Sequence, residues 1–80
     1  MNENLIQFAM QSIVLYLQQY PRSADTLEGV HQWWVQWPDI QESILVTDEA
    51  LHRLQNVQQI ESHTLGDREI WRLPREASDE

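Results

Sequence analysis

Apolar residues between Asn4 and Tyr20 recur every three or four positions, and this spacing constrains the fold more than any other feature of the chain. At about 100° per residue, the spacing places them on one face of a helix. Pro21 ends this helix, because proline disfavours helical backbone in the residue before it. The sequence therefore predicts an amphipathic helix whose buried stripe consists of Ile6, Ala9, Met10, Ile13, Tyr16, Leu17 and Tyr20.

A second apolar face on the same helix carries Phe8 and Leu15, which are seven positions apart and so lie above one another. We expect this face to bind a partner protein, and the same helix of a second copy would form a homodimer. In the alternative interpretation, the C-terminal part of the chain folds back over both residues.

The next helix is expected to begin at Asp25 as its N-cap, with Glu28 completing a capping box. It should run to about Trp37, because Pro38 follows. Gly29 weakens this helix and suggests a close helix crossing.

Thr47 is the expected N-cap of a third helix, because Asp48 and Glu49 follow it in the first turn, where the helix dipole favours acidic side chains. This helix should end near Gln58. Residues 39–45 between the two helices suit a short helical turn better than a strand.

A β-hairpin is predicted after the third helix. Residues 60–64 and 69–73 are strand-like and flank a Gly66-Asp67 turn signal. In the second strand, alternation places Trp71 inside and Arg72 outside. The predicted fold class is therefore α+β, with three helices followed by a two-stranded β-hairpin.

This order of elements resembles that of winged helix-turn-helix domains. Residues 46–54 are similar to the third helix of that family and residues 60–73 to its wing. The resemblance covers roughly residues 23–73 and implies a single winged-helix-like domain over residues 1–73, followed by a flexible acidic tail over residues 74–80. The connection between the second and third helices is longer than is typical of the family.

The chain has thirteen acidic residues and five arginines, giving a net charge of −8. This balance opposes nonspecific nucleic-acid binding, which depends on cations that neutralise phosphates. Before residue 53 there is one arginine against seven acidic residues, whereas residues 53–75 hold four arginines against three. An anionic partner would therefore have to bind the last third of the chain.

A sequence-specific DNA-binding regulator is the alternative function. Its contacts would come from the third helix and the wing, through Arg53, Gln55, Asn56, Arg68 and Arg72. Asp48 and Glu49 oppose this function, because they occupy the helix end that would enter the groove.

Catalysis, cofactors and metals are not predicted. The chain has no cysteine and only two separated glycines, and its three histidines lack metal-ligand spacing. Ser62-His63-Thr64 would alternate between the two faces of a strand, which works against a catalytic dyad. The polar N-terminus and interrupted apolar run predict neither a signal peptide nor a membrane span, so we expect a cytoplasmic protein.

Three tryptophans lie close together in the second predicted helix. Trp34 and Trp37 are expected in the core, and Trp33 on the surface as a partner-binding residue in addition to Phe8 and Leu15. The sequence thus predicts a small non-catalytic protein-protein interaction module, either a homodimer through its first helix or a subunit of a larger assembly.

Overall fold

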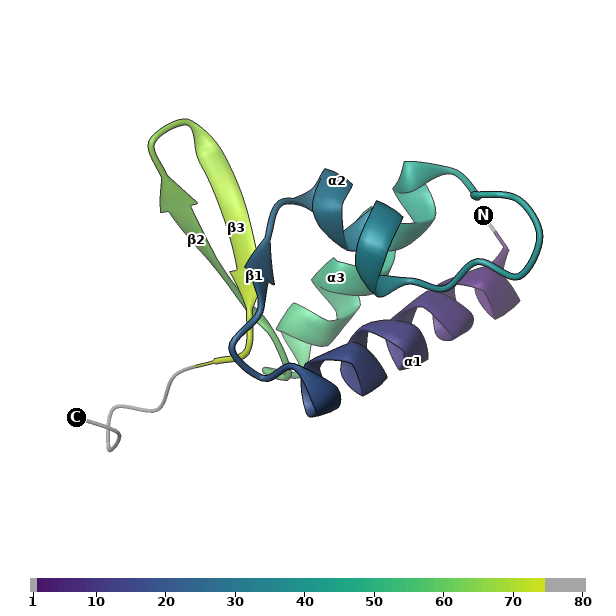
Figure 1. The fold of residues 1–80 in the computed structure, drawn as a ribbon, viewed down its shortest axis with the longest axis horizontal. Helices are drawn as coiled ribbons and strands as arrows, with labels where there is room; N and C mark the ends of the chain where they lie inside the picture. The colour runs from purple at the N-terminus through teal and green to yellow at the C-terminus, as the bar shows by residue number, and fades with distance from the viewer. Residues whose placement is uncertain (1, 75–80) are drawn as a thin grey trace.

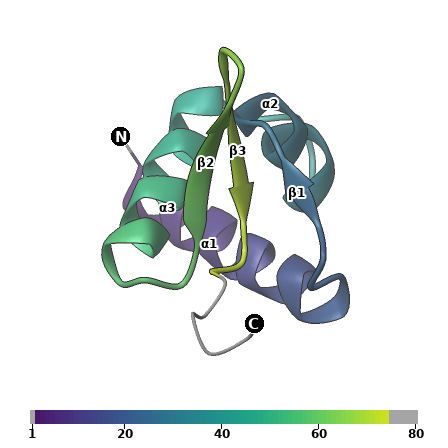
Figure 2. The same cartoon turned by 90° about the vertical axis from the view of Figure 1, so that its left-hand side faces the viewer.

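The computed structural model describes residues 2–74, which form an α+β fold (Figure 1). The helices pack on one another, and a three-stranded antiparallel sheet lies against one end of them (Figure 2). The predicted α+β class is therefore confirmed. Apart from Pro74, the predicted tail lies outside the described residues. No helix within residues 2–74 has the length and apolarity needed to cross a membrane.

Helix α1 spans Glu3–Gln19 and ends before Pro21, as predicted. Its N-terminus is capped by Asn2, whose side-chain oxygen accepts a hydrogen bond from the backbone N–H of Asn4 at 2.9 Å. The predicted stripe is buried at Ile6, Ala9, Ile13 and Leu17. Tyr20, the last residue predicted for the stripe, is 54% exposed because it follows the end of the helix.

The second helical segment begins as α2 (Leu27–Gly29) and continues as the π-helix η1 (Val30–Trp34). Its N-cap is Thr26 and not the predicted Asp25, whose carboxylate accepts from the N–H of Thr26 at 2.8 Å. The predicted end at Trp37 is also wrong. Val35 already has extended backbone and turns into the core, so the helix ends three residues earlier.

Gly29 is tightly packed, and the atoms nearest to it belong to a side chain that precedes its helix. A Cβ atom at this position would clash with the carboxylate of Asp25. The glycine therefore makes room for the carboxylate that precedes its own helix.

Helix α3 spans Ile44–Asn56 and packs against α1. Its N-cap is Ser43, whose Oγ accepts from the N–H of Leu45 at 3.2 Å. The predicted cap, Thr47, lies inside the helix and is fully buried, with its hydroxyl hydrogen-bonded to His31. The predicted start was therefore wrong, and the connection between the helical segments covers residues 35–43.

The C-terminus of α3 is capped by a Schellman motif with two backbone hydrogen bonds. The N–H of Gln59 donates to the carbonyl of Leu54, and the N–H of Gln58 donates to that of Gln55, both at 2.9 Å. Gln58 reaches this geometry with a φ of 63°, a left-handed conformation that favours glycine.

Gln58→Gly should therefore raise the free energy of unfolding by roughly 1 kcal/mol, since left-handed backbone costs about that much for a residue with a Cβ. Thermal unfolding followed by circular dichroism measures the effect, with an expected Tm increase of about 4–8 °C. Gln59→Gly serves as the control, because the φ of Gln59 is not positive. An equal gain from both changes would contradict this interpretation.

The sheet has the order β1-β3-β2, so the predicted two-stranded hairpin is incomplete. Strands β2 (Glu61–Leu65) and β3 (Arg68–Arg72) form the predicted hairpin, and the two-residue strand β1 (Ala24–Asp25) pairs antiparallel with β3. This pairing satisfies backbone groups that would otherwise be open along the edge of β3. Gly66 supplies the turn with a φ of 67°, as expected for the first central residue of a two-residue hairpin loop.

The core lies where the helices meet the sheet. Trp71 on β3 is 1% exposed, as predicted, and its ring contacts His52 of α3 edge to face with the centroids 5.3 Å apart. Buried apolar side chains from α1, η1 and α3, with one residue just after η1 and one just before β2, complete the core: Ile6, Ala9, Ile13, Leu17, Val30, Trp34, Val35, Val46, Ala50, Leu51, Leu54 and Ile60.

Candidate interaction surface

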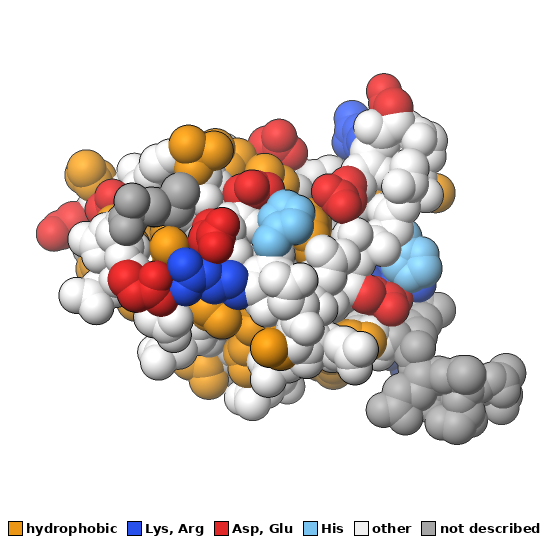
Figure 3. Space-filling model, turned by 180° about the vertical axis from the view of Figure 1, so that it is seen from behind, with side chains coloured by type: hydrophobic (Ala, Val, Ile, Leu, Met, Phe, Trp, Pro, Cys, Tyr) orange, Lys and Arg blue, Asp and Glu red, His pale blue; other side chains and the backbone are white. Residues whose placement is uncertain are grey.

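The outer face of α1 lies in the longest uncharged stretch of the chain, between Glu3 and Arg22. We define this outer face by the exposed residues that recur at helical spacing: Asn4, Gln7, Gln11, Leu15 and Gln18. Charged side chains gather instead around α3 and the sheet, while the lower margin of Figure 3, where α1 runs, is apolar or neutral. The outer face therefore combines a protruding leucine with neutral amides.

Two grooves flank the outer face, and Leu15 lines both of them. The first, which we call the α3 groove, has a volume of about 400 Å³ and is lined by Gln7, Met10, Gln11, Val14, Leu15, Leu54 and Gln59. The second, the aromatic groove, has a volume of about 580 Å³ and is lined by Phe8, Ser12, Leu15, Tyr16, Gln18, Gln19, Tyr20, Trp34 and Gln36. Neither groove contains a charged side chain.

Stacked rings form one wall of the aromatic groove. Tyr16 lies nearly parallel to Trp34, with an interplanar angle of 11° and ring centroids 5.0 Å apart. The ring of Tyr20 packs against that of Tyr16, with the two centroids 4.9 Å apart. Because Trp34 is buried and belongs to the core, this wall is held in place by the fold.

The three predicted partner-binding residues differ in their surroundings. Leu15 is 61% exposed. Phe8 lines the aromatic groove with Leu15 but is half-buried, its ring centroid 5.8 Å from that of Trp37. Trp33 is 66% exposed on η1 and lines neither groove. The structure therefore brings Phe8 and Leu15 together and leaves Trp33 apart from them.

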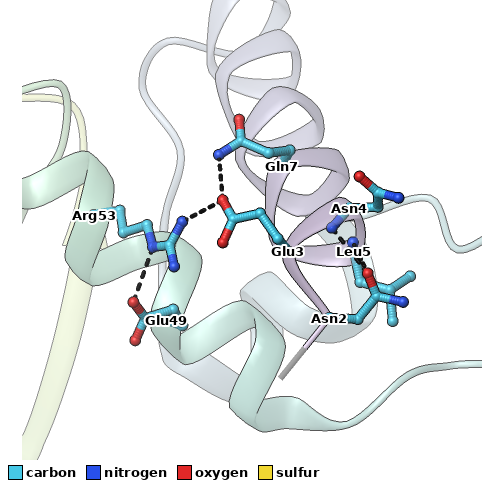
Figure 4. A network of polar contacts seen from close by, with 7 residues as sticks. All are labelled: Asn2, Glu3, Asn4, Leu5, Gln7, Glu49 and Arg53. Atoms are coloured by element: carbon cyan, nitrogen blue, oxygen red, sulfur yellow. Dashed lines mark hydrogen bonds and ion pairs between the residues drawn. The ribbon is translucent and has the colours of Figure 1, made fainter.

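Arg53, predicted to contact DNA, is held by two carboxylates (Figure 4). Its Nη1 donates to the Oε2 of Glu3 at 2.6 Å, and its Nε donates to the Oε2 of Glu49 at 2.9 Å. The hydrogen bonds from Arg53 and then Gln7 lower the pKa of Glu3, and both carboxylates raise the pKa of Arg53. The network ties the first turn of α1 to α3 and neutralises the guanidinium.

Arg72 is also paired with an acidic residue. Its Nε donates to the Oε2 of Glu61 at 2.9 Å, and the Nε2 of His63 lies 2.8 Å from the same oxygen. The hydrogen bond with His63 and then that with Arg72 lower the pKa of Glu61. Because β2 and β3 are neighbours, these contacts hold the two strands together on one face of the sheet.

Glu61→Gln should destabilise the protein at neutral pH by about 0.2–1 kcal/mol, the usual range for an ion pair near the surface. The lowered pKa means that the ionised carboxylate stabilises the fold, and that this contribution is lost as the pH falls below ~4.3, the ordinary pKa of glutamate. Urea unfolding at pH 7 and pH 3 measures the difference. Asp67→Asn in the hairpin turn is the control, and a pH-independent cost at Glu61 would contradict the prediction.

Of the other three residues predicted to contact DNA, Asn56 and Arg68 are exposed and Gln55 is half-buried. Gln55 donates from Nε2 to the hydroxyl of Ser62 at 3.3 Å, which joins α3 to β2. Asn56 is exposed at the end of α3, and Arg68 is exposed on β3. Within residues 2–74 the guanidinium of Arg68 makes no ion pair. The five residues thus do not form one free basic surface.

His31 and Thr47 form a buried polar pair that the sequence did not reveal. The Nδ1 of His31 lies 2.6 Å from the Oγ1 of Thr47, and the two residues are 5% and 0% exposed. The carbonyl of His31 also accepts a hydrogen bond from the indole of Trp37 at 3.0 Å. The contacts join η1 to α3 and to the connection between them, so this histidine has a structural role.

Ser62 and His63, which are neighbours on β2, are each engaged in another contact. The hydroxyl of Ser62 accepts from Gln55, and the ring of His63 contacts Glu61. Within the described part of the chain, no three histidine or acidic side chains are grouped so that they could hold a metal ion.

Comparison of the chain with protein-family models, with curated proteins and with solved structures finds no match.

Proposed function

We propose that this protein is a small non-catalytic interaction module that binds a partner protein through the outer face of α1 and its two flanking grooves. The observation that carries the proposal is the position of Leu15. Its side chain is 61% exposed between two uncharged grooves, on the longest uncharged stretch of a chain with a net charge of −8.

A single exposed leucine is common on protein surfaces, so the side chains around Leu15 matter more than its exposure. The centres of protein interfaces are depleted in charged residues and enriched in aromatic residues and methionine. The outer face meets this description, because Met10 lies on one side of Leu15 and Tyr20 on the other.

The geometry gives less support to DNA binding. Arg53 and Arg72 would have to exchange carboxylate partners at 2.9 Å or less for phosphates or bases. The acidic residues around them repel a polyanion.

The resemblance to winged helix-turn-helix domains stays a prediction. The packing of α1 on α3 and the hairpin formed by β2 and β3 support it. The resemblance concerns the fold and does not by itself favour DNA over protein as the partner.

Affinity capture from extracts of the native cells tests the proposed function. Leu15→Glu should reduce partner recovery at least tenfold compared with the unchanged protein, because it places a charge at the centre of the interface. Leu65→Glu is the matched control, since it adds the same charge at a side chain that is 72% exposed on the hairpin. If all three proteins recover the same partners, the outer face of α1 is not the binding surface.

A further inference from the structure

We propose that the partner on the outer face of α1 is a second copy of this chain, with the two α1 helices packed antiparallel across a two-fold axis near Gln11. The inference rests on the proposed function, because it uses the same face. It adds the identity of the partner and the geometry of the pair.

Charge selects this face for self-association. Two copies that each carry a net charge of −8 repel one another wherever acidic residues meet. The outer face of α1 avoids this cost, because its exposed residues from Asn4 to Gln18 are all neutral. A basic partner would instead favour the acidic surfaces outside this face.

The shape of the face is self-complementary, as an interface between two identical copies requires. It offers both a ridge, at Leu15, and a hollow beside it, the α3 groove. With the axis near Gln11, Leu15 of one copy lies opposite Gln7 of the other, four residues to the other side of the axis. Leu15 then enters the α3 groove, where Met10 and Leu54 supply apolar contacts.

The residue on the axis suits a symmetric contact. A two-fold axis places Gln11 against its own counterpart, and an amide can both donate and accept a hydrogen bond. The two Glu3 residues lie eight positions from the axis at opposite ends of the pair, roughly 24 Å apart at about 1.5 Å of rise per residue. This separation exceeds the Debye length of about 8 Å at physiological ionic strength, so their repulsion is screened.

Substitution of Gln11 by residues of opposite charge tests the proposed position of the two-fold axis. Sedimentation velocity of the purified full chain should show a monomer–dimer equilibrium that strengthens as salt screens the net charge. Gln11→Glu and Gln11→Lys should each weaken the dimer at least tenfold, because each places two like charges face to face. An equimolar mixture of the two variants should restore the dimer, since opposite charges then meet.

Leu65→Glu adds a charge away from the face and should dimerise as the unchanged protein does, and circular dichroism confirms that each variant is folded. An unchanged protein that stays monomeric at all concentrations would overturn the inference. Dimers that survive Gln11→Glu, or a mixture that fails to recover, would also overturn it. If the purified chain is monomeric but Leu15→Glu still abolishes capture from extracts, only the second copy is excluded and the proposed function stands.

Discussion

Trp71→Ala is expected to lower the free energy of unfolding by about 3–5 kcal/mol, the usual cost of truncating a buried tryptophan. Trp71 lies in the middle of the sheet, opposite Ser62 of β2 and Asp25 of β1, and only 1% of it is exposed. Its ring also packs edge to face on His52. Removing the indole therefore leaves a cavity where the sheet meets α3.

The loss is large relative to the whole domain, because folded proteins are stabilised by only about 0.05–0.15 kcal/mol per residue. Urea unfolding monitored by circular dichroism measures it, and the thermal midpoint should fall by well over 10 °C at about 4–8 °C per kcal/mol. Trp33→Ala is the matched control. Trp33 is 66% exposed, so its truncation should change stability by no more than about 0.5 kcal/mol. Similar losses from both changes would show that burial of Trp71 does not anchor the sheet.

Periodicity predicted the elements that depend on local pattern. The stripe of α1 and its end before Pro21 follow from apolar spacing and from proline, and both are found. The hairpin follows from alternation around Gly66, whose positive φ fits its place in the turn. These features depend on residues close together in sequence.

Features that depend on distant contacts were missed. Strand β1 has two residues, too few to show any alternation, and it exists because β3 offers a free edge. Thr47 has the chemistry of an N-cap, yet its hydroxyl is satisfied by His31, and Ser43 caps the helix instead. A capping residue and a buried polar residue look alike in sequence, because both present a hydroxyl next to acidic or apolar neighbours.

On the candidate surface, too, features set by nearby residues were predictable and those set by distant contacts were not. The exposure of Leu15 and the lack of charge around it follow from the helical pattern of α1. The ion pair between Glu49 and Arg53 was within reach of the sequence, since the residues are four apart on one helix. The bond from Arg53 to Glu3 was not, because it spans most of the chain and requires α1 to pack on α3. That contact engages an arginine that was predicted to bind DNA.

Thr47→Val is expected to cost about 1–3 kcal/mol, although valine has nearly the same shape as threonine. The change removes the hydroxyl that shares a hydrogen bond with His31, and a buried ring nitrogen is left without that partner. Urea unfolding measures the loss. Thr64→Val is the matched control, because Thr64 is exposed on β2, where valine is well tolerated.

A double-mutant cycle separates the hydrogen bond from packing. His31→Phe removes the other partner while keeping an aromatic ring beside Trp37. If the hydrogen bond joins η1 to α3, the double variant should be more stable than the sum of the two single losses predicts, by about 0.5–3 kcal/mol. Once both polar groups are gone, neither is left buried without a partner, so the second substitution costs less than the first. Strictly additive losses would show that the two side chains stabilise the core by packing alone.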